Sequence, residues 1–489
     1  MHAAMVLENA KAGMTGRIAA LWPFALIALV AFASRMVWFG DPVADTDEQL
    51  YSLIGAHILQ GQLPFVDLWD RKPFGLFALF ALAHAIGGPG PAAYQVLAAA
   101  FVALGGWLVY ALARPLSNKV TATGAGLLYP LLVYAYAAFS AQSEVFFIPQ
   151  MLGMLVLLRD RPGDTRHAAL AMLLGGLALQ VKYTVAPQCL FLGCVALWPH
   201  RRDALPRLLA RAAGYALLGL LPTLAVAALY AALGHFDEFF YANFVSIFER
   251  LPLDTGRFDP RFLRACAPLA LLAAGGVYAA WRLNPPARHD HYKLIAGWSM
   301  SVLVGIFMTS SVYIHYFAAF APAAILLALP LLDVRSRARW IPLALVLAAG
   351  TALLNIPLHS RDTREEREGV EQLAAMVAPH VGRSRDCLLM FDGPTALYRM
   401  TGSCLPGRFV YPDHLNNALE EPALGTSQAS EVARILAARP GAIVTADSSV
   451  TAQSKASTAL VEQAIAQDYH PLGSVTFRHR TFRAWGRND

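Results

Sequence analysis

Residues 41–75 read DPVADTDEQLYSLIGAHILQGQLPFVDLWDRKPFG, and they lie between the first two strongly apolar segments of the chain. This stretch is rich in ionisable side chains, namely Asp41, Asp45, Asp47, Glu48, Asp67, Asp70, Arg71 and Lys72. Charged groups beside a bilayer are costly unless they line a polar cavity or bind a ligand. We therefore expect the loop 40–91 to carry the chemistry of this protein and the remaining chain to support it.

The composition is that of a membrane protein. Of the 489 residues, 56% are hydrophobic and 15% are charged, and the mean hydropathy is +0.45. A soluble domain is far less apolar. The formal net charge of +6 comes from short basic clusters between apolar segments. Such clusters are typical of membrane topology and not of a surface that follows a nucleic-acid backbone, so nucleic-acid binding is not expected.

Apolar segments of near-spanning length recur up to residue 357. A membrane-crossing helix needs about 20 apolar residues, and on this measure we expect about eleven spans. They are 19–39, 92–113, 120–139, 144–158, 167–181, 185–199, 212–233, 263–281, 293–310, 313–333 and 338–357. The first resembles a signal peptide, but its apolar run is long enough for an uncleaved helix.

Segment 74–88 is the ambiguous one, because it is short and ends in the helix breakers Gly87-Gly88-Pro89-Gly90-Pro91. If it does not span, the later basic clusters fall on the same side as Lys11 and Arg17, which is then the cytoplasm. If it does span, all of those clusters move outside and violate the positive-inside rule. We therefore expect a juxtamembrane helix at 74–88. The loop 40–91, the turn at 140–144, the Lys182 turn, the loop 234–262 and the tail after 358 then all face outward.

After about residue 358 the pattern changes to that of a small α/β domain. Helices are expected near 363–379, 394–401, 428–438 and 455–467, strands at 387–391 and 442–445, and a hairpin pairing 472–478 with 481–486. This division predicts a transmembrane domain over 1–357 and an extracytoplasmic domain over 358–489. The second domain could bind the acceptor or cap a cavity. Outside the cytoplasm Cys387 and Cys404 could form a disulfide, and the sequence leaves that open.

Two clusters in the loop 40–91 suggest chemistry. Asp45, Asp47 and Glu48 could deprotonate a hydroxyl or hold a divalent ion, or they could simply cap a helix. Arg71 and Lys72 precede the 74–88 helix, where cations oppose the helix dipole and backbone N–H groups favour an anion. A phosphate site is one interpretation of these cations, and snorkelling to lipid headgroups is the other.

Three further positions stand out at the outer ends of the expected spans. Glu144 and Lys182 lie at tight turns between short apolar segments, where ionisable residues are tolerated beside a water-filled cavity or as a mutual ion pair. We expect such a cavity to open outward. His315 could contact substrate or belong to an aromatic belt. The loop 234–262 is interpreted as an interfacial helix followed by a mobile segment.

Several short motifs, taken in order, resemble one enzyme superfamily. They are Asp47-Glu48-x-x-Tyr51, Gly61-x-Leu63-Pro64-Phe65-x-Asp67, Lys72-Pro73, Glu144 at an outward turn, Gly175-Gly-Leu-Ala-Leu-Gln-Val-Lys182 and His315-Tyr-Phe-x-x-Phe-x-Pro322. Together they resemble the polytopic GT-C glycosyltransferases of the protein O-mannosyltransferase and lipid A aminoarabinose transferase superfamily, in its bacterial branch. The resemblance covers most of the chain.

The resemblance implies a multi-pass protein of the bacterial inner membrane, with its N-terminus in the cytoplasm and its C-terminal domain in the periplasm. It implies that a sugar is transferred, with inversion, from a polyprenyl-phosphate donor to an envelope acceptor at the periplasmic face. The acceptor would be lipid A, lipopolysaccharide, another glycan or a protein.

The resemblance also implies roles for individual residues. Asp47 would be the catalytic base or a metal-contacting carboxylate, with Asp45 and Glu48 beside it. Lys72 would contact the donor phosphate, with Arg71 and Lys182 as further cations. The expected substrate contacts are Tyr51, Asp70, Glu144, His315 and Tyr316. The aminoarabinose transferases carry an acidic residue where this chain has Arg71, so a divalent metal stays open, and no other cofactor is expected.

The sequence suggests two alternatives to an enzyme. A transporter or scramblase of lipid-linked sugars would also place charges in a membrane cavity, but at the midplane and commonly between inverted repeats. Here the polar groups gather at the outer ends of the spans, and no inverted repeat is found. The third interpretation is a non-catalytic scaffold, for which Asp47→Ala would be silent.

Overall fold

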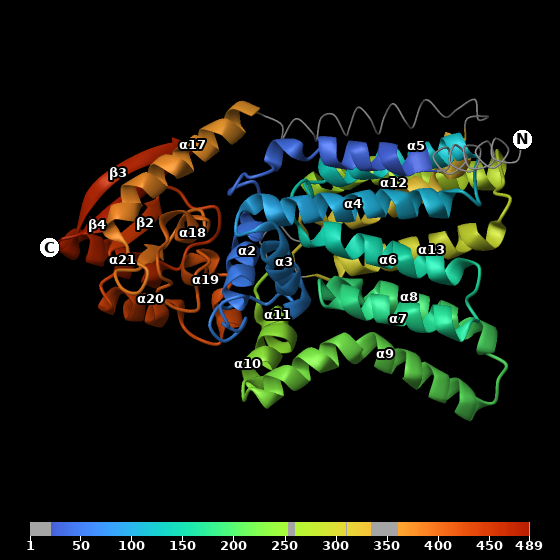
Figure 1. Cartoon of the computed structure of the whole chain (residues 1–489), viewed down its shortest axis with the longest axis horizontal. Coiled ribbons are helices and arrows are strands. Elements are labelled where there is room, and N and C mark those ends of the chain that lie inside the picture. Colours follow the sequence, from blue (N-terminus) through green and yellow to red (C-terminus); the bar gives the residue numbers. More distant parts are fainter. Residues whose placement is uncertain (1–20, 253–259, 310, 334–359, 489) are drawn as a thin grey trace, which may run out of the picture.

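The computed structural model describes residues 21–252, 260–309, 311–333 and 360–488. Long helices lie side by side in a bundle, and the C-terminal residues form a separate body at one end of it (Figure 1). The bundle contains a helix within Leu21–Trp38 that ends in η1 (Met36–Trp38), and then α4 (Pro91–Ala113), α5 (Lys119–Ala135), α6 (Ser143–Arg159), α7 (Thr165–Leu179), η2 (Tyr183–Val185), α8 (Ala186–Leu197), η3 (Trp198–His200) and α9 (Leu205–Ala232). It continues with α12 (Pro260–Arg282), α13 (His289–Phe307), η5 (Ile314–Phe320), α14 (Ala321–Leu327) and α15 (Leu329–Leu332).

Within the described residues, four helices are long and apolar enough to cross a membrane: Leu21–Trp38, α4, α9 and the Arg264–Arg282 part of α12. The other expected spans within these residues form helices at the expected places, but these are either short, such as the 12 residues of α8, or, like the 19 residues of α13, not among those four. The expected span 338–357, the basic residues Lys11 and Arg17, and part of the loop 234–262 lie outside the described residues. The expected number of eleven spans is therefore not established.

Close contact between helices holds the bundle together. At Gly106 of α4, an added Cβ would lie 2.9 Å from the backbone oxygen of Gly126 in α5. Small residues at helix contacts let two backbones approach, as is common in membrane proteins. The bundle therefore packs through backbone proximity as well as through large apolar side chains.

The loop 40–91 forms two short helices, α2 (Thr46–Ile58) and α3 (Phe74–Gly87). Both run crosswise to the long helices, between the bundle and the C-terminal body (Figure 1). The 14 residues of α3 end at Gly88, which has a positive φ of 85°. A helix that lies along the membrane surface runs across the direction of the membrane-spanning helices, and α3 has this direction relative to the long helices of the bundle. Nearby, α10 (Phe236–Phe240), the π-helix η4 (Tyr241–Val245) and α11 (Ser246–Glu249) form the helical part of the expected interfacial segment.

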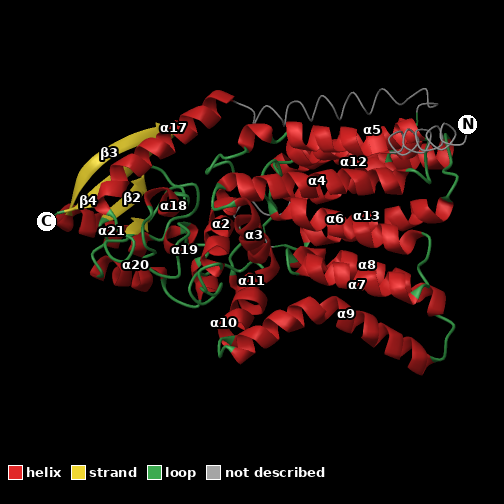
Figure 2. Cartoon of the chain, in the orientation of Figure 1, coloured by secondary structure: helices red, strands yellow, loops and turns green. Residues whose placement is uncertain are grey.

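The C-terminal residues form the expected small α/β fold. Its helices are α17 (Ser360–Val377), η6 (Ala378–His380), α18 (Leu397–Thr401), α19 (Asp413–Asn416), η7 (Glu421–Leu424), α20 (Gln428–Ala437) and α21 (Lys455–Asp468). The strands β1 (Leu388–Met390), β2 (Ala442–Ala446), β3 (Tyr469–Phe477) and β4 (Arg480–Arg487) form one sheet in the order β1-β2-β4-β3. Figure 2 shows strands of this sheet, in yellow, within the C-terminal body.

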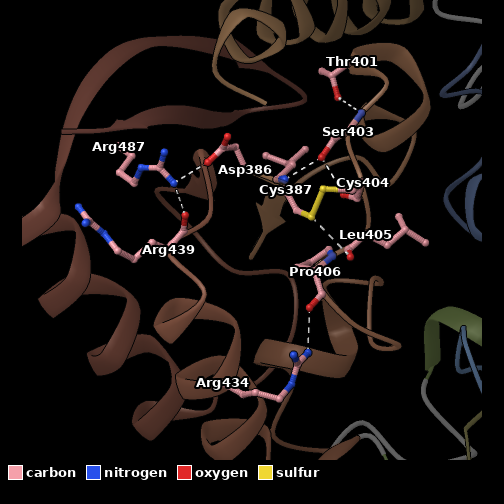
Figure 3. The surroundings of a disulfide bond; sticks show 11 residues. Asp386, Cys387, Thr401, Ser403, Cys404, Leu405, Pro406, Arg434, Arg439 and Arg487 are labelled. Atoms are coloured by element: carbon pink, nitrogen blue, oxygen red, sulfur yellow. Dashed lines mark hydrogen bonds and ion pairs between the residues drawn. A yellow bond between two sulfur atoms is a disulfide. The ribbon is translucent and has the colours of Figure 1, made fainter. Parts of the chain in front are cut away.

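The sheet is mixed, and a disulfide braces its edge. Strand β1 pairs with β2 in parallel, with Leu389 opposite Ile443, and the remaining pairs are antiparallel. Cys387, just before β1, is bonded to Cys404 (Figure 3). The disulfide that the sequence left open is therefore present in the structure.

Candidate functional site

Asp45 links the start of α2 to the turn after α5. Its backbone is extended, and its Oδ1 atom accepts a hydrogen bond from the Asp47 N–H at 3.0 Å, which caps the helix. The same oxygen accepts a 2.6 Å hydrogen bond from the Gln142 amide. The capping role weighed from the sequence is therefore observed, and it places Asp45 and Gln142 beside Asp47.

Asp47 is a half-buried carboxylate. Its Oδ2 atom accepts a hydrogen bond from the Tyr51 hydroxyl, one helical turn later, at 3.3 Å. Within the described part of the chain, no cation lies within 4.0 Å of this carboxylate, and its Oδ1 atom accepts no hydrogen bond. Asp47 therefore has one oxygen available to receive a proton.

Glu48 points into the protein instead. It is fully buried, and it accepts hydrogen bonds from the Gln95 amide at 3.0 Å, the Ala141 N–H at 2.8 Å and the Ser140 hydroxyl. Burial, and then the charge of Asp45, raise the pKa of Glu48 to about 8. Glu48 thus holds the turn that carries Gln142, and the structure does not bring it to the same face as Asp47.

Lys72 lies across the Tyr51 ring from Asp47, with its Nζ atom 5.8 Å from the ring centroid. Burial lowers the pKa of Lys72, but the charges of Asp47, Asp70 and Glu144 outweigh this, and the pKa is raised overall. The described residues place no carboxylate within 4.0 Å of its ammonium group. Lys72 is therefore a charged group that is available to bind an anion.

Asp70 and Arg71 are committed to other contacts. The Asp70 carboxylate is buried and accepts hydrogen bonds from the backbone N–H groups of Arg71 and Lys72, at 2.5 and 3.3 Å. The Arg71 guanidinium pairs with Glu420 of the C-terminal body and lies 5.5 Å from the Trp69 ring centroid. Glu420 also pairs with Arg250 at 2.5 Å. Arg71, expected at a phosphate, is thus engaged in a contact between the two bodies.

Glu144 and Lys182 form the mutual ion pair that was weighed against a substrate role. The Lys182 Nζ atom lies 2.5 Å from the Glu144 carboxylate and 3.8 Å from the ring centroid of Tyr316. His315 packs edge-on against Tyr316 at 4.8 Å and stacks on Tyr313. A small pocket beside them is lined by Glu144 and Tyr316, among other residues.

These groups belong to one site. The charges of Asp47, Asp70 and Glu144 all act on Lys72, although Glu144 comes from α6 and Lys72 from the loop before α3. From the C-terminal body, Tyr411 lies close enough for burial and the nearby aspartates, including Asp47, to raise its pKa. The two halves of the loop 40–91 and the ends of α6 and α7 therefore meet at this point.

The C-terminal body lies against this site through polar contacts from several elements. Arg399 donates hydrogen bonds to the Ser52 hydroxyl and to the Pro89 oxygen, and Arg367 pairs with Asp41 at 2.8 Å. Two backbone contacts join the bodies as well. The Trp69 N–H donates to the Arg408 oxygen at 2.8 Å, and the Leu251 N–H donates to the Leu419 oxygen at 3.1 Å. The body thus covers the loop 40–91.

Sequence reasoning missed five residues around the site: Gln142, Arg250, Arg399, Tyr411 and Glu420. Gln142 lies in the turn already singled out for Glu144, so its position carried a signal. Arg250 lies in the loop 234–262, which was interpreted as interfacial and not as part of the site. Arg399, Tyr411 and Glu420 contact the site from the C-terminal body, and nothing in their local sequence marks them.

The two aspartates at the start of α2 are the candidate ligands for a divalent metal, and Mg²⁺ usually binds one or two carboxylates together with waters and substrate phosphates. Asp45 and Asp47 could offer oxygen atoms, which suit Mg²⁺ or Mn²⁺. Within the described ranges, however, no group of three or more His, Cys, Asp and Glu side chains is arranged to hold an ion.

Comparison with known proteins identifies the fold. Residues 71–229 match the family model described as dolichyl-phosphate-mannose-protein mannosyltransferase. The structure is similar to that of ArnT from Cupriavidus metallidurans bound to undecaprenyl phosphate, with a TM-score of 0.61 and 15% identity over 96% of this chain and 98% of that one. The apo form of the same ArnT gives a TM-score of 0.62 at 15% identity, with the same coverage of both chains. No curated protein matches the chain by sequence. The expected superfamily resemblance is confirmed, in the fold and in the matched segment.

Proposed function

We propose that this chain, a multi-pass membrane protein with the GT-C fold of the protein O-mannosyltransferase and aminoarabinose transferase superfamily, is a glycosyltransferase. It transfers a sugar from a polyprenyl-phosphate donor to a cell-envelope acceptor at the outer face of the membrane. The observation that carries the proposal is the placement of a carboxylate and an ammonium group around one tyrosine ring. Asp47 accepts a hydrogen bond from the Tyr51 hydroxyl at 3.3 Å, and the Lys72 Nζ atom lies 5.8 Å from the centroid of the same ring.

This arrangement suits a single displacement with inversion. The acceptor hydroxyl oxygen bonds to the anomeric carbon while the bond from that carbon to the phosphate oxygen breaks, and the electron pair leaves with the lipid phosphate. The hydroxyl proton passes to the open oxygen of Asp47, which acts as general base. The ammonium group of Lys72 stabilises the charge that grows on the phosphate. No nucleotide takes part.

Asp45 supports this chemistry as a neighbouring carboxyl group. Burial and the charge of Asp47 raise the pKa of Asp45 to about 7. Asp45 is therefore largely protonated below about pH 7, since two adjacent carboxylates are unfavourable when both are charged. The Gln142 hydrogen bond fixes the Asp45 carboxyl group next to the base.

The donor phosphate is proposed to bind between the two lysines. Lys72 supplies the unpaired charge, and Lys182, held by Glu144 and lying over Tyr316, is the second cation. His315 and Tyr316 then lie on the donor side of the site. The ArnT structure with undecaprenyl phosphate supports a lipid phosphate as the leaving group, because the two structures share a fold over 96% of this chain.

The experiment is reconstitution of the full-length protein in nanodiscs with labelled undecaprenyl-phosphate sugars and an envelope glycolipid extract. The wild type should release undecaprenyl phosphate and label the extract. Asp47→Asn should lower the rate by about 10²–10⁴-fold, the usual contribution of a positioned base. The control is Asp237→Asn, which removes an exposed carboxylate from α10. No release of lipid phosphate by the wild type with any sugar, or an unaffected Asp47→Asn variant, would refute the proposal.

Sugar and acceptor are identified by comparing envelope glycans of a deletion strain with those of its parent. Loss of one defined sugar from lipid A, lipopolysaccharide or a glycoprotein identifies both the donor sugar and the acceptor molecule.

A further inference from the structure

A second, polar cleft lies outside the site around Asp47 and Lys72. It has a volume of about 480 Å³ and opens between the loop that follows α2 and the C-terminal body. Gln62 and Asp67 line it on the loop side, and Gly407, Arg408, Glu431 and Arg434 line it on the other side. None of the residues assigned above to base or phosphate lines this cleft.

The loop wall of the cleft is held in a fixed conformation. The Asp67 carboxylate accepts a hydrogen bond from the Leu63 N–H at 2.7 Å, and the Asp67 N–H donates to the Leu63 oxygen at 2.9 Å. Between them, buried Phe65 has a φ of 71°, in the left-handed region that non-glycine residues rarely adopt. Such strain persists where surrounding contacts enforce it, and it gathers at functional sites.

The opposite wall is braced covalently and by a salt bridge. The disulfide fixes Cys404 at the start of this wall, and the Arg434 guanidinium donates to the Pro406 oxygen at 2.9 Å (Figure 3). Arg434 also makes two hydrogen bonds to Glu431, at 2.6 and 2.9 Å. At Gly407 an added Cβ would lie 2.1 Å from the Arg434 guanidinium, so only glycine leaves Arg434 in place.

The two walls differ in charge balance. Glu431 is neutralised by Arg434. The Arg408 guanidinium lies 4.7 Å from the ring centroid of Phe409, and the described residues bring no carboxylate within 4.0 Å of it. The cleft therefore offers hydrogen-bond donors and acceptors on both walls. Its lining carries two carboxylates, of Asp67 and Glu431, and two guanidinium groups, of Arg408 and Arg434. The Arg408 guanidinium acts on Glu238 only from a distance and is held in no close ion pair among the described residues, and a guanidinium binds carboxylates and phosphates well.

We propose that this cleft binds the carbohydrate part of the acceptor, and that this glycan carries an anionic substituent that pairs with Arg408. The inference rests on the proposed glycosyltransferase function and names its acceptor class. The five residues from Asp67 to Lys72 span at most about 18 Å, so one oligosaccharide can lie in the cleft and extend toward the reaction site. The Trp69 N–H bond to the Arg408 oxygen keeps the two walls together.

The test measures binding of a defined probe to the full-length protein in nanodiscs. The probe is the phenol-extracted glycolipid fraction of a deletion strain, used with and without removal of its phosphate groups. Arg408→Ala should weaken binding about tenfold or more, as expected for loss of a hydrogen bond between charged groups. Arg408→Lys should retain part of the affinity. The matched control is Arg483→Ala, which removes an exposed arginine from β4 of the same body.

Three outcomes would overturn the inference. They are equal affinities of the Arg408→Ala and Arg483→Ala variants, absence of binding by the wild type, and binding that is abolished by protease treatment of the probe, which would indicate a protein acceptor.

Release of undecaprenyl phosphate to water is measured separately and needs no acceptor. Arg408→Ala should leave this release unchanged while it raises the KM for the glycolipid. A wild type that binds the glycolipid but releases no lipid phosphate would refute the proposed function and not the cleft.

Discussion

Lys72 differs from the other cations near the site in having no carboxylate partner among the described residues. Arg71 is paired with Glu420, and Lys182 is paired with Glu144. An unpaired ammonium group beside Asp47 is stabilised further when a phosphate binds, so Lys72 should contribute more to donor binding and to the transition state than either paired cation.

We therefore predict that Lys72→Gln lowers kcat/KM for the undecaprenyl-phosphate donor by about 10²–10³-fold, the usual effect of removing one charged group at developing charge. Lys72→Arg should recover part of the activity. Lys293→Gln, which removes an exposed lysine from α13, is the control. Steady-state kinetics in nanodiscs measure the effect. A Lys72→Gln variant as active as Lys293→Gln would contradict the assignment.

The raised pKa of Glu48 leads to a separate prediction, because it makes the free energy of unfolding depend on pH. The folded protein holds the Glu48 proton up to about pH 8, whereas the unfolded chain loses it near the ordinary value of 4.5. The folded state therefore binds more protons between these values, and this group favours folding less as the pH rises from about 4.5 to 8. Glu48→Gln removes the titration but turns an amide NH2 group toward a donor, either the Gln95 amide or the Ala141 N–H and the Ser140 hydroxyl. Its Tm should lie below that of the wild type at pH 5.5, and the gap should narrow toward pH 8.5. A gap that is independent of pH would show that Glu48 does not titrate in this range.

At the scale of elements, Glu420 joins three segments that are far apart in the sequence. It follows α19 in the C-terminal body, and it pairs with Arg71 before α3 and with Arg250 after α11. Such a carboxylate between two arginines is largely desolvated. Removing its charge leaves both arginines uncompensated, which typically costs about 3–5 kcal/mol.

Glu420→Gln should therefore loosen the C-terminal body while each body keeps its own fold. Two backbone amides report on this contact: the Trp69 N–H, bonded to Arg408, and the Leu251 N–H, bonded to Leu419. We expect faster hydrogen exchange at both amides and a lower Tm. Glu368→Gln, which changes an exposed carboxylate of α17, is the control. Unchanged exchange at Trp69 and Leu251 would show that other contacts carry the junction.

At the scale of the whole molecule, local patterns predicted the elements well. The segment expected at 92–113 is α4, Pro91–Ala113, because an uninterrupted apolar run leaves little choice of length. The strand expected at 442–445 is β2, Ala442–Ala446. The acidic residues at the start of α2 were also recognised, because caps and first-turn charges are local features.

Long-range partners could not be predicted in the same way. Glu420 is 349 positions from Arg71, and Tyr411 reaches the acidic residues from the C-terminal body. The inward direction of Glu48 depends on the helix periodicity of α2 and on where the 140–142 turn packs against it. These contacts follow from how the two bodies dock. No spacing of residues within one segment encodes such docking, so the paired state of Arg71 and the buried state of Glu48 were missed.

The orientation of the molecule in the membrane is the last prediction, and it rests on charge asymmetry and on the disulfide. Basic residues cluster between α8 and α9, where Arg201 and Arg202 lie, and such clusters favour the cytoplasmic side. The Cys387–Cys404 bond needs an oxidising compartment, which places the C-terminal body on the other side. Single cysteines at Arg202 and at Ser448, in a background with Cys189, Cys194 and Cys266 replaced by Ala, should therefore react differently in intact cells. A membrane-impermeant maleimide should label Ser448→Cys in cells whose outer membrane is permeabilised, and it should label Arg202→Cys only after the inner membrane is disrupted. The reverse pattern would place the site around Asp47 in the cytoplasm, where a lipid-phosphate donor at the outer face could not reach it.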